Sequence, residues 1–139
     1  MKKIGIATIF LSLVIGIVPL FTECLAMGRV MTLANGMTAP MRCHWTAMAE
    51  MALAVPLLGL GTFMTFSRQR ETRLSLSTLG VILGVFAILI PTVMIGVCPD
   101  PSMMCNMVMR PTLVLSGIII SAMYLGTLAV SMKAVQQPA

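Results

Sequence analysis

The chain has 139 residues, of which 58% are hydrophobic and 9% charged, with a net charge of +5 and a mean hydropathy of +1.02. A soluble domain is about half apolar and a quarter charged, so this composition excludes a water-soluble globule. One membrane-spanning helix needs about 20 residues, so four of them leave no room for a soluble catalytic domain. We therefore expect an all-α, polytopic membrane protein.

Four apolar stretches are expected to cross the membrane as helices, and they cover residues 4–25, 46–66, 74–97 and 111–132. Each is long enough for a hydrocarbon core about 30 Å thick at a rise of about 1.5 Å per residue. The prolines and glycines inside them are tolerated because neighbouring membrane helices satisfy the freed backbone groups. The sequence predicts one domain over residues 1–139, a four-transmembrane-helix bundle made of two helical hairpins.

The positive charges predict the orientation of these spans. Six of the nine lysines and arginines fall at the N-terminus, in the turn between the second and third spans, and in the tail. Because cytoplasmic segments carry an excess of such residues, both termini and this turn should be cytoplasmic. The cations are spread over helix ends, so topology explains them better than a nucleic-acid-binding patch would, and no nucleic-acid partner is expected. The six are Lys2, Lys3, Arg68, Arg70, Arg73 and Lys133, and the three on the opposite side are Arg29, Arg42 and Arg110.

The first span has an alternative interpretation as a secretory signal. Two lysines and an apolar stretch precede Cys24-Leu25-Ala26, which fits a small-x-small cleavage site. The apolar stretch is longer than usual, however, and the bulky Phe21 and the acidic Glu23 lie close to that site. Cleavage would also leave an odd number of cysteines outside the membrane. A retained helix is therefore favoured, with a cleaved leader as the alternative.

All four cysteines, Cys24, Cys43, Cys98 and Cys105, fall at the predicted outer ends of the spans. Disulfides persist on the oxidising side of a membrane. The sequence therefore predicts two disulfides that cap the bundle. Among the three connectivities, Cys24–Cys43 with Cys98–Cys105 is favoured, because each bond closes one hairpin across a short loop at about 3 kcal/mol apiece. The crossed pairings stay open.

Methionine is concentrated in the two outer loops, Met27–His44 and Cys98–Arg110, which hold eight of the fifteen methionines. Thioethers, thiolates and imidazole suit Cu(I). One hypothesis is therefore an outer-face copper site. The alternative is that methionine fills an irregular apolar cap, and oxidation of the cysteines would remove the best ligands. The candidate ligands are Cys43, His44, Met103, Met104, Met107 and Met109.

Glu50 is an acid well inside the second span. It lies seven residues beyond Cys43 and four beyond Thr46, so the three side chains share one face of a helix. Intramembrane acids are costly and commonly functional, although a buried hydrogen bond that fixes helix register is an equal alternative. The candidate partners of its carboxyl group are Arg42, Arg110, Ser121 and Tyr124.

Thiol chemistry is another possible use of the cysteines, since four spans with two outer cysteine pairs resemble quinone-linked membrane oxidoreductases. Such catalysts need an exposed thiol of low pKa with a close resolving partner, typically in Cys-x-x-Cys. The sequence has no Cys-x-x-Cys, and Pro99-Asp100-Pro101 between Cys98 and Cys105 fits a rigid structural loop better. His44 and Arg42 could still activate Cys43, so an outer-face thiol–disulfide oxidoreductase stays an alternative.

The segment Met41-Arg42-Cys43-His44-Trp45-Thr46, together with Glu50, Cys98-Pro99-Asp100-Pro101 and Met104-Cys105, resembles a family of small bacterial four-span membrane proteins of unknown function. The resemblance covers nearly the full chain, and Met-x-Cys-His-Trp-Thr is its most specific part. It implies a bacterial cytoplasmic (inner) membrane protein and supplies no catalytic residue. It also implies an accessory role beside ABC-type exporters that have large outer domains.

The leading functional hypothesis is a non-enzymatic accessory subunit of the membrane with a disulfide-stabilised outer cap. Small residues such as those of Gly80-x-x-x-Gly84 favour close packing of helices. The expected partners are the lipid bilayer and either a larger integral membrane protein or a second copy of this chain. This hypothesis needs no cofactor, whereas the copper hypothesis does.

Overall fold

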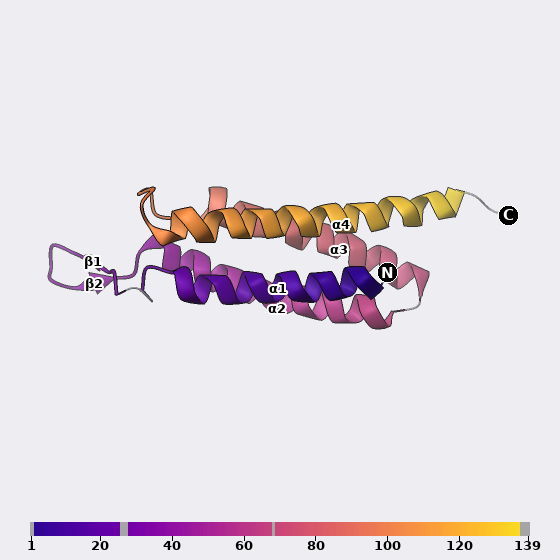
Figure 1. Cartoon of the computed structure of the whole chain (residues 1–139), viewed down its shortest axis with the longest axis horizontal. Helices are drawn as coiled ribbons and strands as arrows, with labels where there is room; N and C mark the ends of the chain where they lie inside the picture. The colour runs from indigo at the N-terminus through magenta and orange to yellow at the C-terminus, as the bar shows by residue number, and fades with distance from the viewer. Residues whose placement is uncertain (1, 26–27, 68, 137–139) are drawn as a thin grey trace.

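The computed structural model describes residues 2–25, 28–67 and 69–136 of the chain. It consists of four long helices that run side by side (Figure 1): α1 (Lys2–Thr22), α2 (Arg42–Phe66), α3 (Arg70–Leu89) and α4 (Arg110–Gln136). A π-helical turn, η1 (Ile90–Met94), extends α3, and a second, η2 (Cys105–Met109), leads into α4. Met27, Arg68 and Ala26, on which predictions above rest, lie outside the described residues.

The four helices, counted with their π-helical extensions, are each long and apolar enough to cross a membrane. Large hydrophobic side chains are exposed along their outer surfaces, among them Phe10, Phe63 and Phe66. Such a surface is stable in lipid and unstable in water. The predicted all-α class, the four-helix bundle and the multi-pass membrane architecture are thereby confirmed.

The bundle is built from two antiparallel hairpins, because α1 packs mainly on α2 and α3 mainly on α4. Glycine allows this close approach within each hairpin. A Cβ atom at Gly61 would lie 3.1 Å from the carbonyl oxygen of Gly5, and one at Gly84 would lie 2.5 Å from Ser121 Oγ. The predicted role of Gly80 and Gly84 in helix packing is confirmed, since the Tyr124 ring lies directly against Gly80.

The helix boundaries differ from the predicted spans at the end that carries the cysteines. Helix α1 ends at Thr22 instead of residue 25, and α2 begins at Arg42 instead of residue 46. The third helix changes to π geometry around Pro91, which has no backbone N–H to continue the α-helical pattern. The amides of Ile95 and Gly96 both donate to the carbonyl of Ile90, at 3.1 and 3.2 Å. Proline therefore accounts for the change in α3. At the opposite end, α3 begins at Arg70 instead of residue 74, and α4 ends at Gln136 instead of residue 132.

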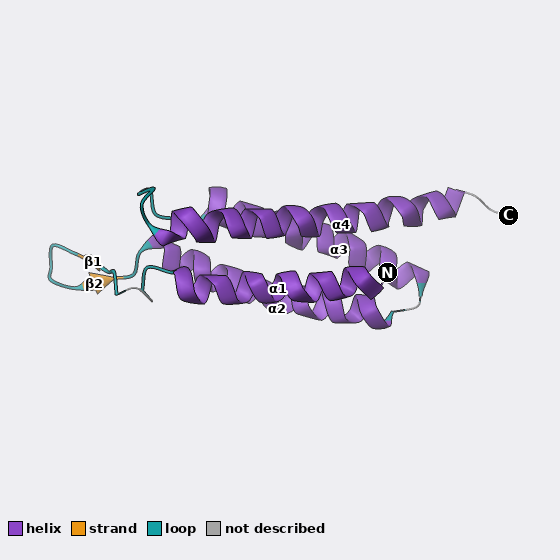
Figure 2. Ribbon diagram, viewed as in Figure 1, coloured by secondary structure: helices purple, strands orange, loops and turns teal. Residues whose placement is uncertain are grey.

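A small antiparallel ribbon between α1 and α2 was not predicted. Strand β1 (Met31–Thr32) pairs with β2 (Thr38–Ala39), with Met31 opposite Ala39 and Thr32 opposite Thr38. Gly36, at φ +73°, lies in the turn that joins the strands. The ribbon projects beyond the helices (Figure 2). Its two-residue strands are too short to alter the all-α class.

The two ends of the bundle carry different segments (Figure 1). The start of α1, the α2–α3 connection and the end of α4 lie at one end, and the ribbon and the α3–α4 connection lie at the other. We call the latter the cysteine end, because Cys24, Cys43, Cys98 and Cys105 lie there. The segments predicted to be cytoplasmic thus share one end. Which side of a membrane that end faces stays a prediction.

Candidate functional site

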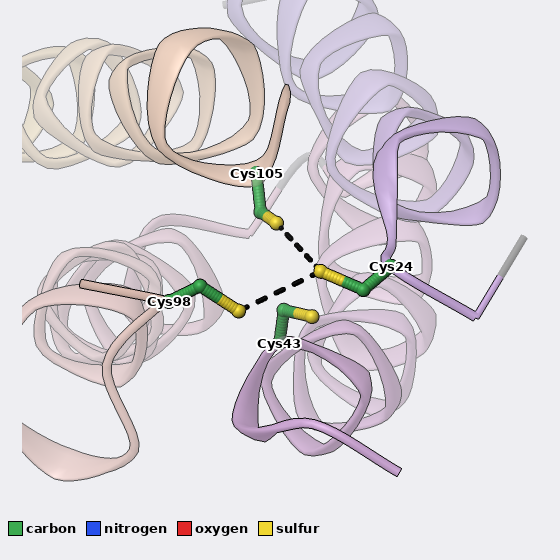
Figure 3. A group of neighbouring side chains, drawn as sticks. All are labelled: Cys24, Cys43, Cys98 and Cys105. Atoms are coloured by element: carbon green, nitrogen blue, oxygen red, sulfur yellow. Dashed lines mark hydrogen bonds between the residues drawn. The ribbon is translucent and has the colours of Figure 1, made fainter. Parts of the chain in front are cut away.

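The four cysteines, which we call the four-cysteine cluster, point toward one another between the helices (Figure 3). All four Sγ atoms lie within 4.8 Å of one another. Cys24 Sγ lies 3.0 Å from Cys105 Sγ and 3.5 Å from Cys98 Sγ. Cys24, Cys43, Cys98 and Cys105 are 3, 0, 6 and 1% exposed, respectively, and the structure holds them as thiols. The cluster is therefore a compact, buried centre of four sulfur atoms.

Each cysteine comes from a different segment. Cys24 follows the end of α1, Cys43 lies in the first turn of α2, and Cys105 opens η2. Cys98 lies two residues beyond Gly96, whose φ of +75° turns the chain away from η1. The cluster thus joins both hairpins at a point where all the helices are ending or beginning.

Two sets of hydrogen bonds hold the segments that carry these cysteines in place. Thr46 Oγ1 donates to the carbonyl of Gly96 at 2.6 Å, which ties the first turn of α2 to the turn before Cys98. Asp100 Oδ1 accepts from the backbone N–H and the hydroxyl of Ser102, at 3.0 and 2.7 Å. These bonds to Ser102 hold the pKa of Asp100 below its ordinary value. The result is a capped turn that leads into η2, as the predicted rigid loop between Cys98 and Cys105 requires.

The cysteine environments favour different protonation states. Burial raises the pKa of the Cys24 thiol, and hydrogen bonding to the Cys105 thiol adds to this effect. Burial also opposes ionisation of Cys98, but hydrogen bonds from Cys43 and Cys24 outweigh it and lower the pKa of Cys98. Cys98 is therefore the more easily ionised of these two thiols. Cys24 gives up its proton only to a strong competitor such as a metal ion.

The spacing of the sulfur atoms fits a single thiophilic ion. A tetrahedral site with metal–sulfur bonds of about 2.3 Å places its sulfurs about 3.8 Å apart. The sulfurs here span 3.0 to 4.8 Å, so small side-chain adjustments would suffice. A polynuclear iron–sulfur cluster needs its cysteines farther apart, because iron and sulfide occupy the space between them. Four thiolates favour Zn²⁺ or Cu(I) among the biological metals.

Of the six predicted copper ligands, Cys43 belongs to the four-cysteine cluster. The His44 ring instead pairs with Glu23, with 2.9 Å between Nδ1 and Oε2. Met103 packs against the buried core and Met109 is fully buried, whereas Met104 and Met107 are exposed. The structure therefore brings the four cysteine sulfurs closer together than the predicted set of cysteine, histidine and methionine ligands.

Met41 carries a thioether that contacts the four-cysteine cluster and that the sequence analysis did not select. Its Sδ lies 4.0 Å from Cys98 Sγ. Met41 precedes Cys43 by two residues in a methionine-rich loop. That proximity in sequence was the available signal, but neighbouring methionines of the same loop share it. Contact with Cys98, which lies in the other hairpin, depends on the tertiary structure.

The predicted disulfide pairing, Cys24–Cys43 with Cys98–Cys105, stays a prediction. Two close sulfur–sulfur contacts join Cys24 to residues of the other hairpin, namely Cys105 at 3.0 Å and Cys98 at 3.5 Å. A disulfide bond is about 2.05 Å long. The two sulfur atoms of either contact would therefore have to move about 1 Å or more closer together to form one. The arrangement thus gives Cys24 two alternative partners across the hairpins.

Glu50 lies below the cluster on α2 and is fully buried. Among the described residues, neither of its carboxyl oxygens has a hydrogen-bond partner, and the same is true of Ser121 Oγ. The predicted hydrogen bonds from Arg42, Arg110, Ser121 or Tyr124 to this carboxyl group are therefore not made among the described residues. Glu50 is a buried acid whose polar atoms the surrounding helices leave unsatisfied.

A cavity of about 220 Å³ adjoins the four-cysteine cluster. Cys24 and Cys105 form part of its wall, so two of the buried cysteines border a space large enough for a small ligand. The remaining lining residues, Arg29, Ser102, Met103 and Met104, come from the segments that follow α1 and precede η2.

Residues 6–130 match a family described as a domain of unknown function, DUF4418. The match covers most of the chain, so the protein belongs to this family, whose lack of an assigned function agrees with the resemblance noted in the sequence. No curated protein and no solved structure matches the chain. The function therefore has to be argued from the four-cysteine cluster and the membrane helices.

Proposed function

We propose that this DUF4418 protein is a membrane protein that binds one thiophilic metal ion through Cys24, Cys43, Cys98 and Cys105. One observation carries the proposal, namely that four buried sulfurs from four segments lie within 4.8 Å of one another. Four thiols have little reason to share so small a space unless they bond to each other or to a common ion. Their spacing matches the separation of sulfurs around one tetrahedral ion to within about 1 Å.

The metal ion would also have a structural effect. It would join α1, α2 and the segments around α3 and α4 at the cysteine end of two hairpins whose own helices contact each other more than the hairpins do. An ion that binds the folded state and not the unfolded state stabilises the fold by about 4 kcal/mol at a thousandfold excess over its Kd. Most lysines and arginines lie in the segments at the opposite end of the bundle, which supports an orientation with the cysteine end on the non-cytoplasmic side.

The test is the metal content of the reduced, full-length protein purified in detergent. We expect about one equivalent of Zn²⁺ or Cu(I) per chain after reconstitution, and loss of binding in the Cys24→Ser, Cys43→Ser, Cys98→Ser and Cys105→Ser variants. Met48→Leu is the matched control, because Met48 is an exposed thioether on α2. Unchanged metal content in all four cysteine variants would overturn the proposal.

A second candidate is a non-enzymatic accessory subunit whose cysteine end is closed by disulfides. The distance of 3.0 Å between Cys24 Sγ and Cys105 Sγ supports it, because oxidation there would link the two hairpins covalently. The family resemblance adds a larger membrane partner such as an ABC-type exporter, and the exposed apolar helix surfaces offer contact area for it or for a second copy. Co-purification of an integral membrane partner would support this role.

Alkylation of the native protein without reductant, followed by mass spectrometry, separates the candidates. Two disulfides resistant to mild reductant support the accessory subunit. Four thiols that become reactive only after chelation support the metal site. A single labile pair would instead favour the outer-face thiol–disulfide oxidoreductase, whose reactive thiols would have to be reached through the cavity beside Cys24 and Cys105.

A further inference from the structure

The sulfur-bearing side chains that line the cavity beside the four-cysteine cluster differ in how deeply they are buried. Two of its lining residues are cluster cysteines, Cys24 and Cys105, and two are methionines, Met103 and Met104. Met104 is 48% exposed, whereas Met103 is half-buried and packs against the core. The cysteines beyond them are nearly inaccessible. Sulfur ligands therefore extend from the surface to the cluster in order of increasing burial.

We infer that this cavity is the route by which Cu(I) reaches the four-cysteine cluster, with Met104 and Met103 binding the ion first. The inference rests on the proposed metal site and deepens it by naming the ion and its path. Thioethers bind Cu(I) well and Zn²⁺ poorly, so two methionines on the path favour copper. Cys43 and Cys98 do not line the cavity, so an arriving ion meets Cys24 and Cys105 first.

Arg29 also lines the cavity and contributes a positive charge. A hydrated divalent cation is repelled by such a charge, whereas Cu(I) carried by thiolate or chloride ligands arrives as a neutral or anionic complex. Asp100 lies close enough to Arg29 to feel its charge, and this attraction helps to lower the pKa of Asp100. The Asp100 carboxylate offsets part of the positive charge of Arg29, so the preference for Cu(I) rests mainly on the two methionines that line the cavity.

The transfer is a ligand exchange without a change of oxidation state. The bond between Cu(I) and its donor ligand breaks as a bond to the Met104 or Met103 sulfur forms, and copper remains Cu(I). The thioether–copper bond then breaks as cysteine sulfur binds. Each thiol that binds as a thiolate releases one proton to water, and the released donor ligand leaves through the same cavity.

The experiment follows transfer of Cu(I) from its complex with bicinchoninate to the reduced full-length protein in detergent. Absorbance of the complex reports both the rate and the final occupancy. The test variant is Met103→Leu/Met104→Leu, which keeps side-chain volume. The matched control is Met107→Leu, an exposed methionine of η2 that does not line the cavity.

We expect transfer to the double variant to be at least about tenfold slower, which corresponds to about 1.4 kcal/mol in the barrier. Final occupancy should match that of the unsubstituted protein, and Met107→Leu should load at the unsubstituted rate. Equal rates for the double variant and the control would overturn the route. So would preference of the unsubstituted protein for Zn²⁺ over Cu(I), although the proposed metal site would then stand. Failure to bind either ion would overturn the metal site itself.

Discussion

The middle of each hairpin and the cysteine end are held together in different ways. Within the hairpins, helices approach closely at glycine, as where Gly84 faces Gly117 and Ser121. At the cysteine end, the helices give way to π turns, a ribbon and proline-rich loops, and side chains converge on the four-cysteine cluster. Shape complementarity, which works in lipid without any ligand, forms the hairpins. At the cysteine end the hairpins meet at the four sulfur atoms and at the hydrogen bond from Thr46 to Gly96, and the sulfur atoms can respond to pH, oxidation and metal ions.

The largest expected effect is an opposite pH dependence of the metal-free and metal-bound proteins. Burial raises the pKa of Cys24, so the folded metal-free state holds this proton more tightly than the unfolded state does. The contribution of Cys24 is fully present below the unfolded thiol pKa of about 8.5 and is lost as pH rises above it. The lowered pKa of Cys98 contributes stability that grows with pH and is complete above about 8.5, so the decline in the metal-free protein is expected above that pH. Metal binding instead releases protons, so affinity should rise about tenfold per pH unit for each proton released.

Thermal unfolding in detergent between about pH 7 and 9.5, with and without metal, checks this prediction. The variant with all four cysteines replaced by serine should lose both trends. Parallel pH trends in the metal-free and metal-bound proteins would show that the cluster thiols do not release protons to a bound ion.

A glycine substitution tests the hairpin side of the comparison. A Cβ at Gly84 would lie 2.5 Å from Ser121 Oγ and 3.2 Å from the Gly117 carbonyl oxygen. We expect Gly84→Ala to lower the free energy of unfolding by about 1–3 kcal/mol, while metal stoichiometry stays unchanged. In Gly59→Ala, the control, the added methyl group meets nothing within 4 Å, so stability should stay equal or rise by up to about 1 kcal/mol. Equal losses in both variants would contradict close packing at Gly84.

Glu50 lies between the middle of the α1–α2 hairpin and the cysteine end. Substituting it tests whether a buried polar group stabilises either region. Its carboxyl oxygens have no hydrogen-bond partner in the described part of the chain, so Glu50→Leu should raise the free energy of unfolding by about 1–3 kcal/mol. Glu50→Gln, which keeps the shape and an uncharged polar group, should change stability less. Destabilisation by Glu50→Leu, measured by chemical unfolding in detergent, would indicate a ligand or partner that satisfies the carboxyl group.

The smallest expected effect concerns His44. Its polar contact with Glu23 lies near the surface, with the two side chains 19 and 13% exposed, so His44→Ala should cost up to about 1 kcal/mol. Metal content should remain at the unsubstituted value, because His44 is not among the four ligands. Loss of copper in His44→Ala alone, measured beside Glu23→Gln, would restore the predicted site of Cys43, His44 and methionine.

Hydrophobicity and charge were sufficient to predict the helices and the shared end of the cysteines. The predicted second span, for example, differs from α2 by four residues at its start and not at all at its end. The candidate site was harder to predict from the sequence. Sequence placed Cys43 beside His44 and paired Cys24 with Cys43, because neighbours along a loop are the neighbours that sequence reveals. The contacts of Cys24 with Cys98 and Cys105 span more than 70 residues, and no local pattern encodes them.

The sequence by itself determined that the protein is a bundle of four membrane-spanning helices with its cysteines and many of its methionines at one end. It could do so because burial in lipid depends on the composition of each segment separately. The tertiary structure alone decided that four sulfurs meet at one point, that His44 turns to Glu23, and that Glu50 has no hydrogen-bond partner among the residues the structure describes. These features depend on how each helix is rotated and which helix lies beside it. Glycine packing sets that rotation through contacts between distant segments.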